Sequence, residues 1–200
     1  MKTLKFFILA MALCNIGTAM AQTRPGIKAG LNSSNISNTS LDTKSGIYIG
    51  AFADIPITDY YSLQPELLYS SQGGNSNSPL YGDVNINYFS IGLPNKFYVS
   101  PDKGFHFTLG LGLDINFENN FVNLTNFNGD DEISPVDVTV IGGIGYEFGF
   151  GLIIEARYKQ GTISVDFFGE DDLYEETGSN LNGVFQIGAA YKFKLYKNAD

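Results

Sequence analysis

The feature of this sequence that most limits how it can fold is a strict alternation of apolar with small or polar residues. The clearest stretch is Phe105–Phe117, in which every second residue from Phe105 is apolar and the residues between are polar or glycine. A period of two places successive side chains on opposite faces of a β-strand. The stretch is therefore predicted to be a strand with one apolar face.

The same pattern recurs seven more times along the chain. Together with Phe105–Phe117, the predicted strands are Gly26–Asn35, Ser45–Ile57, Tyr60–Gly73, Val84–Val99, Val136–Phe148, Leu152–Gly161 and Leu181–Leu195. The connections between them alternate between long and short. In an up-and-down barrel odd and even connections lie at opposite ends, and outer-membrane barrels have short periplasmic turns and long external loops.

We therefore predict an all-β fold, an eight-stranded antiparallel up-and-down transmembrane β-barrel. The expected location is the outer membrane of a Gram-negative bacterium, with the N-terminus in the periplasm and the long loops outside the cell. No stretch after the first 21 residues approaches the length of apolar sequence that a transmembrane helix needs.

The first 21 residues have the pattern of a secretory signal peptide. Lys2 and Lys5 precede an apolar run that is too short to span a bilayer, and Ala19 and Ala21 form a small-x-small cleavage site. We predict that residues 1–21 are a signal peptide and that residues 22–200 are the barrel. Cys14 is the only cysteine of the chain and would be removed, so the exported barrel would contain no disulfide.

The polar faces of the strands carry charges of both signs. They are interleaved with glycines, and an eight-stranded barrel has an interior just wide enough for side chains. Because glycine on the outside of a soluble lipocalin-like carrier would gain nothing, we assign these faces to the lumen of a membrane barrel. The predicted lumen ion-pair residues are Lys28, Glu66, Asp114, Glu147, Glu155, Arg157 and Lys192, with Asp54, Lys96 and Lys159 on the same faces. A structural plug is preferred to an ion or proton path, which stays an alternative.

Two further features of the strands bear on this fold. Aromatic residues gather near strand ends, with Tyr60, Phe97, Tyr98, Phe105, Phe148, Phe150, Tyr191 and Phe193 toward the short turns and Tyr69, Phe89, Phe117 and Tyr158 toward the long loops. Two such girdles are typical of membrane barrels. Pro65 and Pro94 fall inside predicted strands, where proline removes a ladder donor, so we expect β-bulges there.

The two longest predicted loops are acidic. Their carboxylates are Asp130, Asp131 and Glu132 in the first loop, and Glu170, Asp171, Asp172, Glu175 and Glu176 in the second. Oxygen-rich loops can hold divalent cations, but the spacing matches no defined calcium loop, so a solvated acidic surface is the preferred interpretation.

Other kinds of chemistry have little support in the sequence. His106 is the only histidine and is predicted to lie next to a short turn, away from the external loops, which disfavours a lipid or peptide hydrolase that would use it as a base. We expect no metal site and no cofactor. The net charge of −9 argues against a nucleic-acid partner.

Several segments are similar to one family of barrels. The chain resembles the PorT-like outer membrane β-barrel domain family in Gly26–Asn32, Ser62–Gly73, Gly143–Phe148, Glu155–Tyr158 and Tyr191–Phe193. It departs from the pattern at Tyr88–Gly92, which lacks an acidic residue and proline, and at Lys194–Asp200, which follows the final aromatic residue. The resemblance implies a small outer-membrane barrel, and a member linked to protein secretion gives the family its name.

The leading functional hypothesis is a non-enzymatic envelope protein with an ion-paired, plugged lumen. It would be a monomer in outer-membrane lipid and would act through its acidic external loops, as a structural or interaction protein or as an accessory of another envelope assembly. The alternatives are a narrow channel, a barrel hydrolase that uses His106, and a soluble lipocalin-like carrier.

Overall fold

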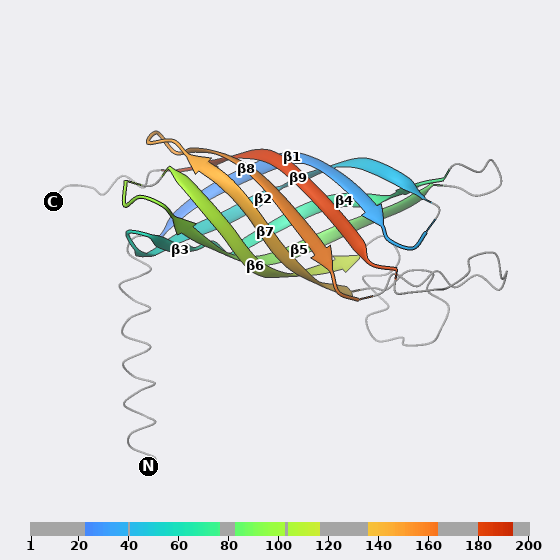
Figure 1. Cartoon of the computed structure of the whole chain (residues 1–200). Coiled ribbons are helices and arrows are strands. Elements are labelled where there is room, and N and C mark those ends of the chain that lie inside the picture. The colour runs from blue at the N-terminus through green and yellow to red at the C-terminus, as the bar shows by residue number, and fades with distance from the viewer. Residues whose placement is uncertain are drawn as a thin grey trace, which may run out of the picture.

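The computed structural model describes residues 23–39, 41–76, 83–102, 104–116, 136–163 and 180–193. These residues form nine strands (Figure 1): β1 Arg24–Ile36, β2 Asp42–Thr58, β3 Tyr61–Leu63, β4 Glu66–Asn75, β5 Val84–Tyr98, β6 Phe105–Asn116, β7 Val136–Glu147, β8 Leu152–Gly161 and β9 Asn182–Lys192. In this part of the chain, no helix is both long enough and apolar enough to cross a membrane.

The strands form a closed antiparallel ring. Strands that follow one another in the chain pair, except β3 and β4, and the first and last strands pair from Gly26 opposite Lys192 to Ile36 opposite Asn182. β3 and β4 together fill one position between β2 and β5, so the ring has eight strands. The predicted eight-stranded up-and-down barrel is confirmed, and closure leaves no unpaired sheet edge.

The wall strand made of β3 and β4 is divided at Gln64 and Pro65, but its register does not change. Leu63 lies opposite Asn95 and Glu66 opposite Gly92, which is one continuous register along β5. The predicted bulges at Pro65 and Pro94 are therefore wrong. The register shifts lie in β2 instead, between Thr43 and Tyr48 and between Pro56 and Thr58.

The prolines fit into the sheet because the carbonyl oxygen of each still accepts a backbone hydrogen bond from a neighbouring strand. Pro65 O accepts a hydrogen bond of 2.9 Å from Ala53 N, and Pro94 O accepts one of 2.8 Å from Gln64 N. Because proline has no N–H, the divided strand lacks one backbone hydrogen bond to β2, at Pro65, and one to β5, at Pro94.

A side-chain amide adds hydrogen bonds at this weakened place. Asn95 Nδ2 donates to Leu93 O and Leu109 O, both at 3.1 Å, and Tyr61 OH donates to Asn95 Oδ1 at 2.7 Å. Asn95 thus crosslinks β5 and β6 next to the proline that cannot donate.

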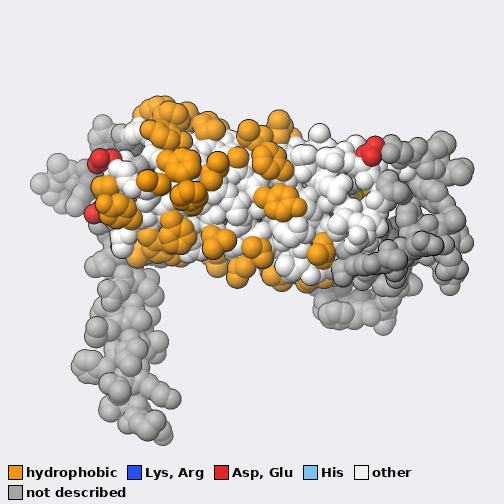
Figure 2. All heavy atoms as spheres, viewed as in Figure 1, with side chains coloured by type: hydrophobic (Ala, Val, Ile, Leu, Met, Phe, Trp, Pro, Cys, Tyr) orange, Lys and Arg blue, Asp and Glu red, His pale blue; other side chains and the backbone are white. Residues whose placement is uncertain are grey.

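The two faces of the wall differ as the alternation predicts. Leu31 and Leu111 are each 61% exposed on the outside, whereas Lys28 and Arg157 are each 2% exposed inside. The outward apolar side chains form what we call the apolar belt: Ile27, Leu31, Ile47, Ile49, Leu67, Leu93, Phe107, Leu109, Leu111, Ile144, Ile154 and Ile187. On the face shown in Figure 2, hydrophobic side chains are dense at the end with the short turns and sparser at the other end.

Most aromatic residues predicted for the girdle near the short turns lie on the outer surface. Tyr60, Phe97, Phe105, Phe148, Phe150, Tyr191 and Phe193 are all exposed there. Tyr98 is an exception, because it is 5% exposed and points into the barrel. Phe89 and Tyr158 are exposed on the outside, whereas Tyr69 is only partly exposed and Phe117 lies outside the described residues.

The two ends of the barrel carry different connections. The short turns at 59–60, 99–104 and 148–151 lie at the end where β1 begins and β9 finishes, at the left of Figure 1. Phe193 N donates to Pro25 O at that end. At the opposite end, β4, β6 and β8 finish and β5, β7 and β9 begin; residues 77–82, 117–135 and 164–179, which connect these strands in the sequence, are outside the described part of the chain. The predicted separation of short turns from long connections is confirmed.

A substitution at Asn95 tests the amide crosslink. Asn95→Leu makes an outward position more apolar, yet we expect it to lower the free energy of unfolding by about 1–2 kcal/mol, because two hydrogen bonds to backbone carbonyls are lost. Urea unfolding of the barrel in lipid vesicles measures the change. Leu111→Ile, at another outward position, is the matched control, and equal stability of the two variants would contradict the crosslink.

Candidate functional site

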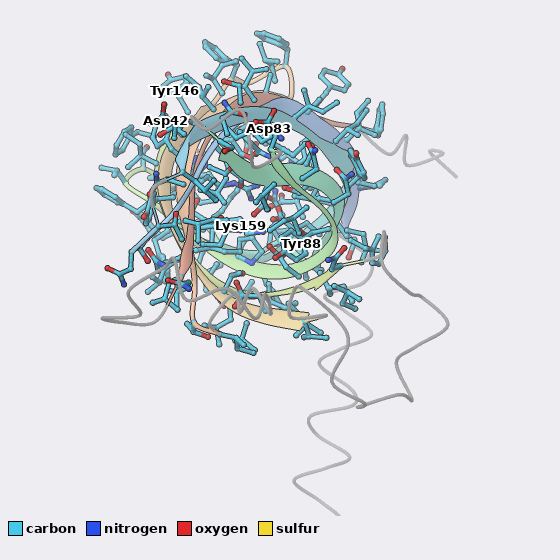
Figure 3. The ribbon with its side chains drawn as sticks, turned by 90° about the vertical axis from the view of Figure 1, so that its right-hand side faces the viewer. Asp42, Asp83, Tyr88, Tyr146 and Lys159 are labelled. Atoms are coloured by element: carbon cyan, nitrogen blue, oxygen red, sulfur yellow. The ribbon has the colours of Figure 1, made fainter. Side chains whose placement is uncertain are left out.

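The interior of the barrel is the candidate site. In the end-on view of Figure 3, Lys159 and Tyr88 lie inside the ring and Tyr146 lies outside it. All ten charged residues predicted for the lumen are buried: Lys28, Asp54, Glu66, Lys96, Asp114, Glu147, Glu155, Arg157, Lys159 and Lys192. Asp137, which the sequence reasoning did not assign to the lumen, is also buried there, at 4% exposure.

Four charges meet in the middle of the lumen, and we call them the central group. Lys28 Nζ lies 2.8 Å from Glu66 Oε2 and 3.0 Å from Glu155 Oε1. Arg157 Nη1 donates to both oxygens of Glu66, at 2.8 and 2.9 Å, and Arg157 Nε lies 3.5 Å from Glu155 Oε1. Two cations and two carboxylates from β1, β4 and β8 thus cancel, as buried charge requires.

Polar side chains continue from the central group along the lumen. Arg157 Nη2 donates to Gln186 Oε1 at 3.0 Å, and Gln186 Nε2 donates to Asn32 Oδ1 at 2.8 Å. Asn32 and Gln72 both donate to Ser70 Oγ, at 3.0 and 2.8 Å. Side-chain hydrogen bonds therefore connect four strands, β1, β4, β8 and β9, inside the barrel.

A second set of ion pairs, the turn-end group, lies toward the short turns. Lys192 Nζ lies 2.9 Å from Asp54 Oδ2 and also forms an ion pair with Glu147. Tyr98 OH donates to Glu147 Oε2 at 2.8 Å. One lysine here serves two carboxylates, so these groups carry a net charge of one negative unit.

A third ion pair, the loop-end pair, lies on the other side of the central group. Lys159 Nζ lies 2.9 Å from both oxygens of Asp114 and donates to Ser90 Oγ at 3.3 Å. Near that end Asp137 Oδ1 accepts from the backbone N–H groups of Thr162 and Ile163, each at 3.0 Å.

Glycines on neighbouring strands make room for the long charged side chains. Gly92 lies opposite Glu66, and a Cβ on it would come within 2.8 Å of Glu66 Cγ. Gly143 lies opposite Arg157, and a Cβ there would come within 2.9 Å of Arg157 Cγ. The inward glycines are thus part of the packing of the charges, as the interleaved pattern suggested.

Two apolar clusters also lie inside the barrel, and the sequence reasoning missed them. Ile36, Ile86 and Tyr88 pack together inside the barrel toward the loop end. Phe52, Ile153 and Ala190 pack together inside it toward the short turns. In the described part of the chain, one apolar cluster therefore lies beyond the loop-end pair, and the other separates the central group from the turn-end group.

Lys96 is the exception to pairing inside the lumen. Its side chain is fully buried, and its ammonium forms no hydrogen bond within the described residues. Its positive charge offsets the surplus negative charge of the turn-end group. Lys96 therefore helps to balance the charge of the lumen without a hydrogen bond to a carboxylate.

His106 lies inside the wall of the barrel, at the end with the short turns. It is fully buried on β6, its Nδ1 lies 3.2 Å from Gly104 O, and its ring lies 5.1 Å from that of Tyr98. A Cβ on Gly145, opposite it, would come within 2.6 Å of His106 Nε2. The histidine is packed against the wall at the end with the short turns.

Two other sets of residues can be placed as follows. Across the described ranges, no group of three or more His, Cys, Asp or Glu side chains is arranged to hold a metal ion. The predicted signal peptide and the acidic loop residues Asp130, Asp131, Glu132, Glu170, Asp171, Asp172, Glu175 and Glu176 lie outside the described residues.

Comparisons with known proteins agree with this architecture. The family model described as "Outer membrane protein beta-barrel domain" matches residues 16–166. The outer membrane protein Ail of Yersinia pestis, solved in a phospholipid bilayer nanodisc, matches with a TM-score of 0.51 and 15% identity, over 86% of this chain and 100% of Ail. None of the curated proteins matches the chain significantly.

Other solved barrels are similar at lower scores. Neisserial surface protein A matches with a TM-score of 0.48 and 17% identity, over 86% of this chain and 97% of its own. The outer membrane enzyme PagL matches with a TM-score of 0.46 and 13% identity, over 85% of this chain and 99% of its own.

Removal of one charge from the central group tests how much the pairing contributes. Arg157→Met leaves Glu66 and Glu155 with only Lys28 close by, so we expect the free energy of unfolding to fall by roughly 3–5 kcal/mol. The double variant Arg157→Met, Glu66→Leu restores charge balance and should recover part of the loss. Urea unfolding in lipid vesicles measures all three proteins.

Arg24→Met is the matched control for this series. Arg24 is exposed on β1, so its loss should change the stability by no more than about 0.5 kcal/mol. A double variant less stable than Arg157→Met alone would contradict the idea that an uncompensated charge causes the loss.

Proposed function

Because the chain belongs to the outer membrane protein beta-barrel domain family, we propose that it is a non-enzymatic outer-membrane barrel with a plugged lumen. It acts as a structural or interaction protein, or as an accessory of another envelope assembly, through its external loops. The resemblance to PorT-like barrels supports the accessory role. The proposal takes the protein to be a monomer surrounded by outer-membrane lipid.

The main support for the proposal is that groups of ion pairs follow one another along the barrel axis. The turn-end group, the central group and the loop-end pair follow one another inside a ring of only eight strands. Since such a ring is just wide enough for side chains, groups that pair across it leave little room for water. The apolar cluster at Ile86 lies beyond the loop-end pair, and the apolar cluster at Ile153 lies between the central group and the turn-end group, so each adds a layer with little room for water.

The orientation follows from the general form of such barrels. The short turns are assigned to the periplasm and the long connections to the outside, because outer-membrane barrels have this asymmetry. The long connections hold the acidic residues Asp130–Glu132 and Glu170–Glu176, so the surface offered to an external partner is negatively charged. A solvated acidic surface of this kind favours basic partners by long-range attraction.

The non-enzymatic role is supported by the surroundings of the single histidine. His106 is fully buried beside Tyr98, and its Nε2 has no hydrogen-bond partner within the described residues. Hydrolysis of envelope lipids or peptides by the purified barrel, lost in His106→Ala, would contradict this part of the proposal.

A planar-bilayer recording tests the plugged lumen directly. The barrel is inserted from detergent, and we expect no steady conductance above the leak of the membrane, since paired side chains occupy the interior. A large porin inserted under the same conditions controls for detection, and a slower gel mobility after boiling checks that the barrel was folded. Steady, large conductance would favour a channel instead.

A further inference from the structure

Three side chains inside the barrel have a buried polar atom that forms no hydrogen bond within the described residues. The atoms are Lys96 Nζ, Gln64 Nε2 and His106 Nε2, and all three side chains are fully buried. Buried polar groups in native proteins are almost always hydrogen-bonded, either to protein or to ordered water. A partner shared by the three atoms would satisfy all of them.

The register of the wall makes these side chains neighbours on the inner face. Lys96 lies opposite Ser62 on β3 and opposite Thr108 on β6. Gln64 follows Ser62 by two residues, and it is buried inside the barrel. His106 precedes Thr108 by two residues and is also buried inside. Both therefore lie diagonal to Lys96, and a long side chain can reach its diagonal neighbours.

The three side chains lie between two sets of ion pairs. Lys96 is attracted by Glu155 of the central group and by Asp54 and Glu147 of the turn-end group, although its ammonium bonds to none of them. The apolar cluster at Ile153 comes from β2, β8 and β9, whereas the three polar atoms come from β5, β6 and the link between β3 and β4. A molecule bound to the polar atoms would therefore be enclosed by ion pairs and apolar side chains.

The hydrogen-bonding character of the three atoms limits what can bind. Lys96 Nζ is a donor, and so is Gln64 Nε2, because Gln64 Oε1 accepts from Lys28 Nζ at 3.3 Å. His106 Nδ1 lies 3.2 Å from Gly104 O, and a carbonyl oxygen only accepts. In the neutral ring Nδ1 therefore carries the proton and Nε2 is an acceptor. The site offers two donors and one acceptor.

We propose that Lys96, Gln64 and His106 bind one water molecule inside the barrel. The water accepts hydrogen bonds from the lysine and the glutamine and donates one to the histidine, and buried waters make about three such bonds. A chloride ion has no hydrogen to donate to His106 Nε2, and a metal cation would be repelled by Lys96. The water holds the Lys96 ammonium in place between the two groups of ion pairs.

The water site goes beyond the proposed function and leaves the lumen closed. One enclosed water with three partners is part of the packing, and it gives ions no path along the axis. Conductance and contact with water are separate measurements. A barrel that does not conduct, but in which no water contacts His106, would overturn the water site and leave the plugged lumen in place.

The test is nuclear magnetic resonance of the folded barrel in nanodiscs with isotope-labelled histidine. Because His106 is the only histidine, every imidazole signal belongs to it. We expect the tautomer with its proton on Nδ1, and transfer of magnetisation from water to the ring proton Hδ2, which lies beside Nε2. A neutral ring with its proton on Nε2, or no transfer from water to Hδ2, would overturn the proposal.

Two variants each remove one donor, and the shift in gel mobility on boiling shows that they have folded. We expect the transfer to Hδ2 to be lost in Lys96→Met and to be weaker in Gln64→Met, which keeps the ammonium. An unchanged signal in Gln64→Met would indicate exchanging ammonium protons as its source and would overturn the proposal, even if Lys96→Met does not fold. Arg24→Met removes an exposed cation of β1 at the same end and is the matched control, which should leave the transfer unchanged.

Discussion

The structure depends on the cost of burying charge in a narrow, water-poor interior. A charged group taken out of water loses several kcal/mol of hydration, which only close partners and good hydrogen bonds can offset. In the central group each carboxylate contacts two cations, and Arg157 also donates to Gln186. Because those partners come from β1, β4, β8 and β9, the pairing can form only when the ring is closed, and it thereby favours one register of the wall.

Register and packing support each other throughout the lumen. A shift of one residue in the pairing of a strand would turn the lumen charges of that strand toward lipid, since side chains alternate between the two faces. It would also separate Gly92 from Glu66 and Gly143 from Arg157, the pairs in which a glycine leaves room for a long side chain. The apolar belt and the charged interior thus both follow from the alternation of side chains along the strands. A shift in strand register would disrupt both of them.

Much of this could be predicted from the sequence because the signal is local. Alternation over ten or more residues identified the strands, the faces and all ten predicted lumen charges. The partners could not be predicted, since Lys28 reaches Glu155 only through closure of β1 on β9. Bulges at Pro65 and Pro94 were expected from a general rule about proline. The strands instead pair in one continuous register past both prolines, and the Asn95 amide adds hydrogen bonds beside them. Tyr98 was assigned outward from its type and place, although it points inward to Glu147.

The central claim, that side chains fill the lumen and exclude water, can be tested by the reactivity of single cysteines in a Cys14→Ser background. Ser70 is fully buried among the lumen amides on β4, whereas Ser45 is exposed on the outer face of β2. We predict that a charged, membrane-impermeant thiol reagent modifies Ser45→Cys within minutes and modifies Ser70→Cys only after the barrel is unfolded. Modification of Ser70→Cys in the folded barrel at a rate comparable to that of Ser45→Cys would show an open, water-filled lumen and contradict the account.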